Sequence, residues 1–321
     1  MIDTIRGVIS TPWDITKLER LASQTDSPWK ITKKKLSDEK GESESWQCNH
    51  RYNGMYIQGS PDGARIIQCS LPRLVFRDRD NTNLIKNEQD LATGLDKMRL
   101  QMLEVLEYDS LPRWTRIDLV WNFLGKIEEY IACFRSTKHP SVRKPTRVYD
   151  GESISWKGKA TEIQIYDKIK EKKETAKHYA NLPLTIVRAE IRKSIPRHGE
   201  KFDLTTELCN PVIGGYLPDF EKCYKYYRRQ LCLLSPKSIP VASSRSPIDF
   251  LAYLQANAIR DPQGTPLIDI YLANKSKSSK YRTMAMIKDR VVRYKFINWH
   301  KILPEDNTPK AVNYDDLRNY A

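Results

Sequence analysis

The chain has 321 residues, 40% of them hydrophobic, and carries 54 Lys and Arg against 40 Asp and Glu, which gives a formal net charge of +14 at pH 7. This length is sufficient for one large domain or two of ordinary size, and the excess of positive charge favours polyanionic partners. The sequence has no apolar run near the roughly 18 residues of a membrane span and no signal peptide at its start. It lacks a P-loop, a GxGxxG or GxSxG motif and any CxxC, HxH or HxxxH spacing, which argues against nucleotide hydrolysis, serine hydrolase chemistry and a compact Cys or His metal site. We therefore expect a cytoplasmic protein with no membrane partner.

Residues 1–76 are predicted to form strands and hairpins. Turn signals at Asn53-Gly54 and at residues 60–63 separate short runs that alternate apolar and polar residues. The charged stretch Lys33 to Ser45 is predicted to be a solvated loop. Leu and Met then recur at helical spacing over Glu88 to Tyr108, which predicts a helix. This part therefore reads as a sheet with a helix laid across it.

Three later segments are predicted strands with polar residues on one face: Trp114 to Phe123, Thr161 to Lys168 and Thr185 to Lys193. Strict alternation turns their apolar side chains to the opposite face, toward the core. Between the first and second segments, the pattern predicts a helix near Ile127 to Arg135, a basic loop over Lys138 to Arg147 and a hairpin around Ser153 to Trp156. The predicted fold class is α+β, a mostly antiparallel curved sheet with packed helices.

The Ser- and Pro-rich stretch 234–247 is predicted to be a linker. It separates a domain of residues 1–233 from a smaller helical region of residues 248–321, with helical apolar spacing over Pro247 to Arg260 and Ser279 to Lys301. A basic segment precedes the second of these helices and is of the kind that contacts phosphates in helix-turn-helix modules. Its candidate DNA-binding residues are Lys275, Lys277 and Lys280. A solvated loop explains the same segment equally well.

The polar faces of the three strands offer an aspartate, a tyrosine and a glutamate to one site. A tyrosine hydroxyl, here that of Tyr166, attacks a phosphodiester when a cation stabilises its anionic form and a divalent metal takes up the charge on the phosphate. Asp118 and Glu190 would hold Mg²⁺ or Mn²⁺, hard ions that take oxygen ligands, and Lys168 would steady the phenolate or the phosphate. The residues expected to grip the DNA backbone are Arg116, Lys157, Lys159, Arg188 and Arg192.

The same residues also fit an ordinary sheet. A strand tyrosine is usually a packing residue, and Asp118 with Arg116, or Glu190 with Arg188, can form a surface ion pair. Periodicity does not show whether the three polar faces meet.

Three segments, in this order, resemble the rolling-circle replication initiators of filamentous phages (the gene II protein) and of staphylococcal-type plasmids. They are WTRIDLVWNF (114–123), ESISWKGKATEIQIYDKIKEK (152–172) and IVRAEIRKS (186–194). The MID start and SLPRLVF (70–76) resemble the phage branch more closely. The likeness covers about residues 1–200.

This resemblance implies an endonuclease that nicks one DNA strand at an origin, keeps a 5′ phosphotyrosine, leaves a free 3′ hydroxyl and later rejoins the ends. Tyr166 in IYDK matches the nucleophile, and Asp118 and Glu190 match the acidic metal-site residues. Plasmid members have a second acid where this chain has Asn122, so the third ligand stays open, with Glu162 or Glu152 as substitutes. The implied partners are an origin in supercoiled, single-stranded or hairpin DNA, the helicase and polymerase of a bacterial host, and a second copy in a homodimer.

Two other functions stay open from the sequence. A non-catalytic origin or operator binder would keep the basic sheet without cleaving DNA, an alternative that Asn122 supports. An RNA-binding regulator would stack bases on the basic, aromatic stretch Tyr224 to Arg229. That stretch is also typical of a helix that is half buried and half solvated.

Overall fold

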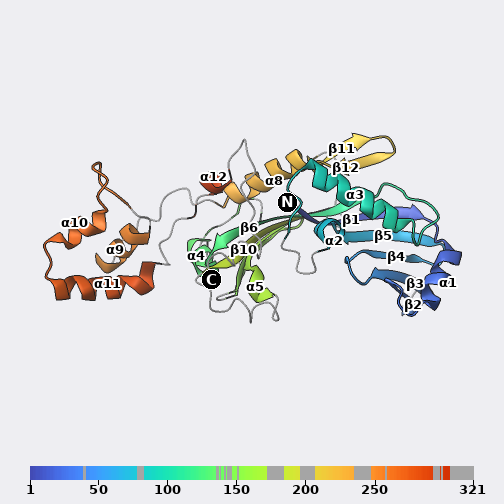
Figure 1. The fold of residues 1–321 in the computed structure, drawn as a ribbon, viewed down its shortest axis with the longest axis horizontal. Coiled ribbons are helices and arrows are strands. Elements are labelled where there is room, and N and C mark those ends of the chain that lie inside the picture. Colours follow the sequence, from blue (N-terminus) through green and yellow to red (C-terminus); the bar gives the residue numbers. More distant parts are fainter. Residues whose placement is uncertain are drawn as a thin grey trace.

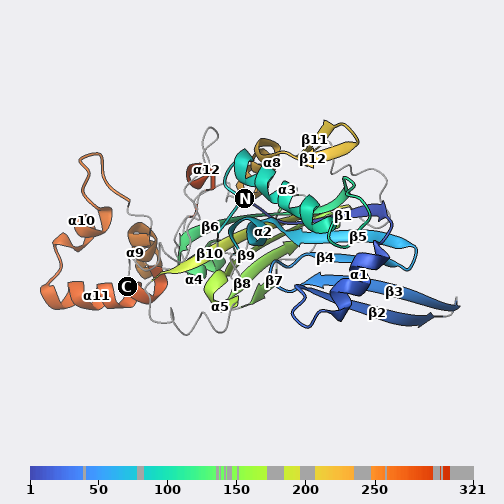
Figure 2. The same cartoon turned by 45° about the vertical axis from the view of Figure 1, so that its right-hand side comes forward.

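The computed structural model describes residues 1–38, 41–77, 83–134, 137, 139–140, 142, 147–149, 152–171, 184–195, 207–234, 247–256, 259–291, 297 and 299–303. It confirms the predicted fold class, because a large antiparallel sheet packs against helices in an α+β arrangement. Within the described residues, ten strands form one sheet in the order β2-β3-β4-β5-β1-β6-β10-β9-β8-β7 (Figures 1 and 2). A separate two-stranded sheet pairs β11 with β12.

The first half of the sheet comes from the N-terminal part of the chain. Its elements are β1 (Ile2–Thr11), α1 (Ile15–Ser23), β2 (Trp29–Asp38), β3 (Gly41–His50), β4 (Tyr56–Ser60), β5 (Gly63–Ser70), α2 (Leu71–Phe76) and α3 (Glu88–Met102). The predicted β4–β5 hairpin and the predicted helix α3 are present. The predicted solvated loop over Lys33 to Ser45 is wrong for its described residues, because residues 33–38 belong to β2 and residues 41–45 to its partner β3. Strand β2 is the edge of the sheet, where charged side chains can face water within a strand.

Two short helices interrupt the region that was predicted to hold only strands and hairpins. Helix α1 begins where the Asp14 carboxylate accepts a hydrogen bond from the Lys17 backbone N–H. Helix α2 begins directly after β5, with Pro72 in its first turn, where a missing N–H removes no helical hydrogen bond.

The second half of the sheet follows in the chain. Its elements are β6 (Arg113–Gly125), α4 (Ile127–Phe134), β7 (Arg147–Tyr149), β8 (Ser153–Lys157), β9 (Thr161–Asp167), α5 (Lys168–Glu171) and β10 (Thr185–Ser194), followed by β11 (Cys209–Val212), β12 (Gly215–Pro218) and α8 (Phe220–Cys232). The three predicted strands, the helix α4 and the β8 hairpin are all present. Most of the predicted basic loop over Lys138 to Arg147 lies outside the described residues.

The two halves of the sheet repeat one another. Counted outward from the centre, the first half runs β1-β5-β4-β3-β2 and the second runs β6-β10-β9-β8-β7. The registers match, because Ile57 of β4 pairs with Ile67 of β5 and Ile163 of β9 pairs with Ile191 of β10. The segments IIQCSLPR (66–73) and EIRKSIPR (190–197) also share Ile, Ser, Pro and Arg at matching places. The antiparallel β1–β6 pair therefore joins two related units at the centre of the sheet.

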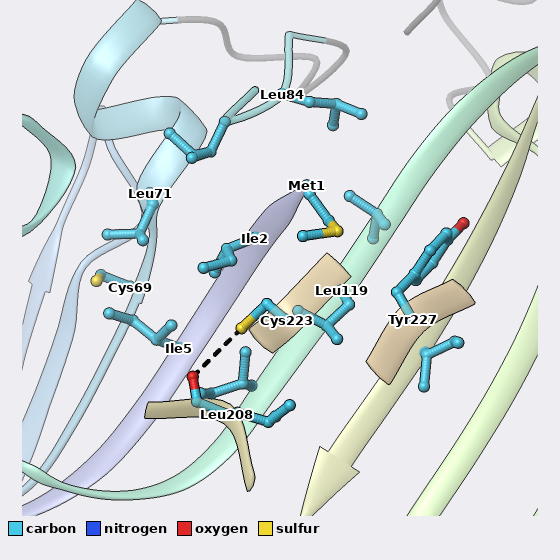
Figure 3. Packing of buried hydrophobic residues seen from close by; sticks show 14 of the residues in the cluster. Met1, Ile2, Ile5, Cys69, Leu71, Leu84, Leu119, Leu208, Cys223 and Tyr227 are labelled. Carbon is cyan, nitrogen blue, oxygen red and sulfur yellow. Dashed lines mark hydrogen bonds between the residues drawn. The ribbon is translucent and has the colours of Figure 1, made fainter. Parts of the chain in front are cut away.

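The hydrophobic core lies between one face of the sheet and the helices that cover it. Ile2 and Ile5 of β1 pack between neighbouring strands, and Cys223 and Tyr227 of α8 lie over this layer (Figure 3). The Tyr227 hydroxyl donates a hydrogen bond of 2.9 Å to the Ala189 carbonyl in β10. Helices α3 and α8 lie along this same side of the sheet in Figures 1 and 2. Alternation along each strand then turns the polar residues to the opposite face.

The helices α9 (Pro247–Ala256), α10 (Leu267–Ala273) and α11 (Lys277–Val291) form a second, smaller hydrophobic cluster around residues such as Leu251 and Ile287. Helix α12 (Trp299–Ile302) instead packs into the main core, where the Trp299 ring stacks on Phe134 with centroids 5.7 Å apart. The predicted helices over 247–260 and 279–301 correspond to α9 and α11, but α9 ends at Ala256, and α11 starts two residues earlier and ends at Val291. Ile297 is not helical, and residues 299–302 form the separate helix α12. Residues 235–246 of the predicted linker lie outside the described residues, so the domain boundaries stay a prediction. No helix within the described ranges is long and apolar enough to cross a membrane.

Candidate active site

The three polar strand faces meet, because β6, β10 and β9 are neighbours in the sheet. Arg192 of β10 is the direct cross-strand partner of both Asp118 and Glu162. Two residues earlier along β10, Glu190 is flanked by Val120 and Gln164, and Arg188 is flanked by Asn122 and Tyr166. Directly paired residues of neighbouring strands point to the same face. The structure thus places the predicted aspartate, tyrosine and glutamate in one cluster.

Tyr166 lies at the centre of this cluster. Its hydroxyl donates a hydrogen bond of 3.1 Å to Oε2 of Glu190, and the Arg188 guanidinium lies on the neighbouring strand. Burial raises the pKa of the Tyr166 hydroxyl well above its usual value, while Arg188 opposes that shift and Glu190 adds to it. The hydroxyl is therefore protonated in the free protein, with Glu190 placed to receive its proton.

Of the two carboxylates of the cluster, Asp118 is buried and Glu190 is partly buried. Burial, followed by the charges of Asp118 and Asp3, raises the pKa of Glu190 to about 7. Burial also raises the pKa of Asp118, although Arg116 favours its ionised form. The Arg116 guanidinium contacts both Asp118 oxygens, with Nε 2.7 Å from Oδ1, and Arg192 Nε lies 3.4 Å from Oδ1. The site therefore holds its carboxylates in direct contact with arginines that offset their charge.

Asp3 of β1 belongs to this site, although the sequence analysis gave it no role. Its carboxylate lies 3.8 Å from Nη1 of Arg188 and accepts a hydrogen bond of 3.3 Å from the Ser70 hydroxyl. Its charge raises the pKa of both Glu190 and Asp118. The available signal was the MID start of the chain, which was noted only as part of the family likeness. Asp3 brings the first half of the sheet into contact with the reactive cluster.

Asn122 holds Arg188 in position. Its side-chain carbonyl accepts a hydrogen bond of 2.8 Å from Arg188 Nε, and both side chains are buried. The prediction that Arg188 grips a DNA backbone from an exposed position does not fit its exposure of 1%. The guanidinium lies inside the cluster beside Tyr166, because Asn122 and Asp3 supply hydrogen-bond and charge partners there.

The donor chemistry of Asp118 and Glu190 suits Mg²⁺ or Mn²⁺. Such ions are commonly bound through one or two carboxylates together with waters and substrate phosphates, and a cation would favour the ionised forms that burial disfavours at both carboxylates. The predicted third ligand Glu162 faces other partners: Lys157 Nζ at 3.8 Å and Arg192 Nη1 at 3.3 Å. Glu152 is exposed. Across the described ranges, no group of three or more His, Cys, Asp or Glu side chains is placed to hold a metal. Two carboxylates therefore fit the ion, and a third protein ligand stays open.

Lys168 does not continue strand β9 as predicted. Asp167 ends the strand and caps α5, because its Oδ1 accepts hydrogen bonds from the backbone N–H groups of Ile169 and Lys170 and from the Thr185 hydroxyl. Lys168 begins this helix, is buried and donates a hydrogen bond of 2.5 Å to Glu171. Burial and the neighbouring Arg188 lower the pKa of its ammonium group. Lys168 therefore interacts electrostatically with Arg188 of the cluster, but its direct hydrogen-bond partner is Glu171.

The remaining predicted DNA contacts lie in different settings. Lys157 and Lys159 are exposed near the edge of the cluster, so a ligand can reach them. The three predicted lysines of the C-terminal region lie around the α10–α11 turn, which Figures 1 and 2 show to one side of the sheet. Lys277 is exposed, Lys280 is half-buried, and Lys275 Nζ lies 5.1 Å from the centre of the Tyr271 ring.

The aromatic stretch of α8 is half buried, as its helical interpretation predicts. Tyr224, Tyr226 and Tyr227 are all buried, and the Tyr227 hydroxyl is bonded to the sheet. Rings held in this way cannot stack on RNA bases, which removes the feature that supported the RNA-binding alternative.

Comparisons with models of protein families and with the sequences of curated proteins found no match. The likeness to rolling-circle initiators therefore stays a prediction from the sequence.

Proposed function

We propose that this protein is a metal-dependent DNA-nicking and strand-transfer enzyme of the rolling-circle initiator type, with Tyr166 as its nucleophile. One observation carries the proposal: the Tyr166 hydroxyl donates to a partly buried carboxylate, Glu190, and lies next to a buried cation, Arg188. A packing tyrosine requires neither a base nor a cation. The combination is what activation of a phenol for attack on phosphorus needs.

The residues of the cluster support the following reaction. The Tyr166 hydroxyl transfers its proton to Oε2 of Glu190, whose pKa of about 7 suits a base at neutral pH. The phenolate oxygen attacks the phosphorus, the bond from phosphorus to the 3′ oxygen breaks, and the leaving oxygen takes a proton from water. Arg188 stabilises the phenolate, and Asn122 and Asp3 keep Arg188 in place. A divalent cation held by Asp118 together with waters and phosphate oxygens would neutralise charge on the phosphate, while Glu190 serves as the base in this step.

The same groups support rejoining. A free 3′ hydroxyl gives up its proton to water and attacks the phosphotyrosine, the bond from phosphorus to the tyrosine oxygen breaks, and protonated Glu190 returns a proton to Tyr166. No external energy source is needed, because the phosphotyrosine keeps the energy of the broken phosphodiester.

The test uses supercoiled DNA that carries the gene for this chain and its flanks. The protein is incubated with this DNA in Mn²⁺ or in EDTA, and a denaturing gel resolves covalent protein–DNA adducts. We expect a nick and an adduct in Mn²⁺ only, both lost in Tyr166→Phe and retained in Tyr149→Phe, which changes an exposed tyrosine of β7. An adduct that survives in Tyr166→Phe would exclude Tyr166 as the nucleophile.

A second candidate function has its own supporting observation. The carboxylates of Asp118 and Glu190 are already paired with Arg116 and Arg192, an arrangement that also suits a sheet that binds DNA without cutting it. In the same experiment, this origin or operator binder would retain the DNA under native conditions, form no adduct, and respond neither to EDTA nor to Tyr166→Phe.

A further inference from the structure

A row of polar side chains continues from the candidate active site across the first half of the sheet. Direct cross-strand pairing places one residue from each of six neighbouring strands in this row. We call it the β2–β6 row, and its members are Arg116, Arg6, Gln68, Tyr56, Asn49 and Lys30. Because directly paired residues share a face, the row lies on the face that carries Tyr166, and Arg116 joins it to Asp118.

Solvent reaches this row along its length. Lys30 is exposed, and Arg6, Gln68, Tyr56 and Asn49 are each partly exposed. The alternate residues of the same strands, such as Ile57 and Ile67, turn to the core on the other face. From β1 to β2 the row spans four strand spacings, or about 19 Å.

The charge of the row suits a polyanion. Arg6 and Lys30 have no carboxylate partner within the described part of the chain, whereas Arg116 is paired with Asp118. Their guanidinium and ammonium groups are therefore available to phosphates, and each contact would release counterions.

The centre of the row presents an oriented aromatic ring between amide side chains. The Tyr56 hydroxyl donates a hydrogen bond of 2.6 Å to Oε1 of Gln58, and Gln58 Nε2 donates one of 3.2 Å to the Ser45 hydroxyl. Neighbouring Gln68 and Asn49 carry both donors and acceptors. Nucleic-acid bases stack on aromatic rings and bond to amides when they are not paired in a duplex.

We propose that the β2–β6 row binds single-stranded DNA next to the cleavage site, with Tyr56 stacking on a base and Arg6 and Lys30 contacting phosphates. The assignment of the neighbouring site as a cleavage site rests on the proposed function. A single strand fits better than a duplex, because a duplex is read by an element that enters a groove and the row lies across a broad sheet face.

The experiment measures the binding of a fluorescein-labelled 30-nucleotide oligo(dT) by anisotropy over a series of NaCl concentrations. The variant Arg6→Gln/Lys30→Gln should reduce the slope of log K against log[NaCl] by about 1.4, because two phosphate contacts are lost. Tyr56→Leu should weaken binding by about 5- to 150-fold, the range for one base stacked on an aromatic ring. The charge control Lys225→Gln changes an α8 side chain that is 71% exposed and should leave both values unchanged. If the double variant behaves as Lys225→Gln does, the row is not a DNA-binding surface.

Two further measurements test whether the row itself binds the DNA and whether it prefers single strands. Gln68→Lys adds a cation to the middle of the row and should tighten binding, a gain that misfolding cannot produce. Unlabelled oligo(dT) should compete at least 10-fold better than a 30-base-pair duplex, and equal competition would overturn the assignment to single strands.

The inference and the proposed function fail separately. Tyr166→Phe should abolish the covalent adduct and leave oligo(dT) binding intact. If the wild-type protein forms no adduct but its binding still depends on Tyr56 and Arg6, the proposed function fails and the row stands. If an adduct forms and binding is indifferent to Tyr56, Arg6 and Lys30, the row fails and the proposed function stands.

Discussion

Strands β10 and β5 occupy equivalent places in the two halves of the sheet, and their side chains differ on the same face. Where β10 has Glu190 and Arg192, β5 has Ile66 and Gln68. The inward isoleucines are kept in both halves. One scaffold thus carries a cluster of buried charges on one side and a neutral and basic surface on the other.

The comparison shows how a sheet face acquires reactive groups. In the second half, burial raises the pKa of Glu190 and of Tyr166, with the charges of Asp118 and Asp3 adding to the shift of Glu190, which brings a base of near-neutral pKa against a phenol. In the first half, the equivalent residues leave the surface suited to binding rather than to proton transfer. We infer that the halves divide the two tasks, with chemistry on β6, β9 and β10 and substrate binding on β1 to β5.

The largest expected effect is on the rate of adduct formation, which depends on residues of the second half of the sheet. Asp118→Asn should lower the rate of adduct formation by about 100-fold or more, because loss of a metal ligand removes several kcal/mol of transition-state stabilisation. Binding of oligo(dT) should not weaken, because loss of the Asp118 charge frees Arg116, and Asp62→Asn, in the exposed β4–β5 turn, should change neither property. An unchanged rate in Asp118→Asn would take this carboxylate out of the reaction.

The structural equivalence of the two halves can be tested at two isoleucines that occupy equivalent positions in β5 and β10. Ile67 and Ile191 are both buried, so Ile67→Ala and Ile191→Ala should each lower the free energy of unfolding by about 2–5 kcal/mol through lost burial and cavity formation. Urea denaturation followed by circular dichroism provides the values, with the partly exposed Ile66→Ala as a milder control. A full loss at one position and almost none at the other would show that only one half is well packed.

The third prediction concerns the pH dependence of stability that Glu190, in the second half of the sheet, should cause. The folded-state pKa of Glu190, about 7, lies above its usual value of 4.5, so the folded chain binds more protons than the unfolded chain between these values. Ionisation of Glu190 therefore lowers stability as the pH rises through this window, and Glu190→Gln should remove that part of the decline. Thermal melting at both ends of the window measures it, with Glu221→Gln, an exposed glutamate of α8, as the control. Parallel melting curves for wild type and Glu190→Gln would contradict the raised pKa.

The smallest expected effects concern the helices that follow the two halves. Asn87 caps α3 by accepting from the Asp90 N–H, and Asp219 caps α8 by accepting from the Lys222 N–H. Asn87→Ala should lower the free energy of unfolding by about 1 kcal/mol. Asp219→Ala should lower it somewhat more, because Oδ2 of Asp219 also accepts a hydrogen bond of 2.5 Å from Asn210. Chemical denaturation resolves the difference, and equal losses would mean that the Asn210 contact adds no stability.

Local patterns predicted much of the fold. Alternation identified β6, β9 and β10 and the faces of their side chains, and apolar spacing identified α3 and α4. The β2–β3 hairpin was not predicted, because its lysine-rich sequence has no clear apolar alternation and because edge strands tolerate charge. The end of β9 was placed one residue late, since the cap at Asp167 depends partly on Thr185, which is distant in sequence.

The sequence by itself determined which side chains share a face of each strand, because that alternation is a property of the local backbone. It therefore pointed to Asp118, Tyr166 and Glu190 as candidates. Only the tertiary structure decided that these residues meet and that Asp3 joins them. It also decided that Arg188 is buried against Asn122, 66 positions away. Strand order and register depend on pairing between distant segments, which no local pattern contains.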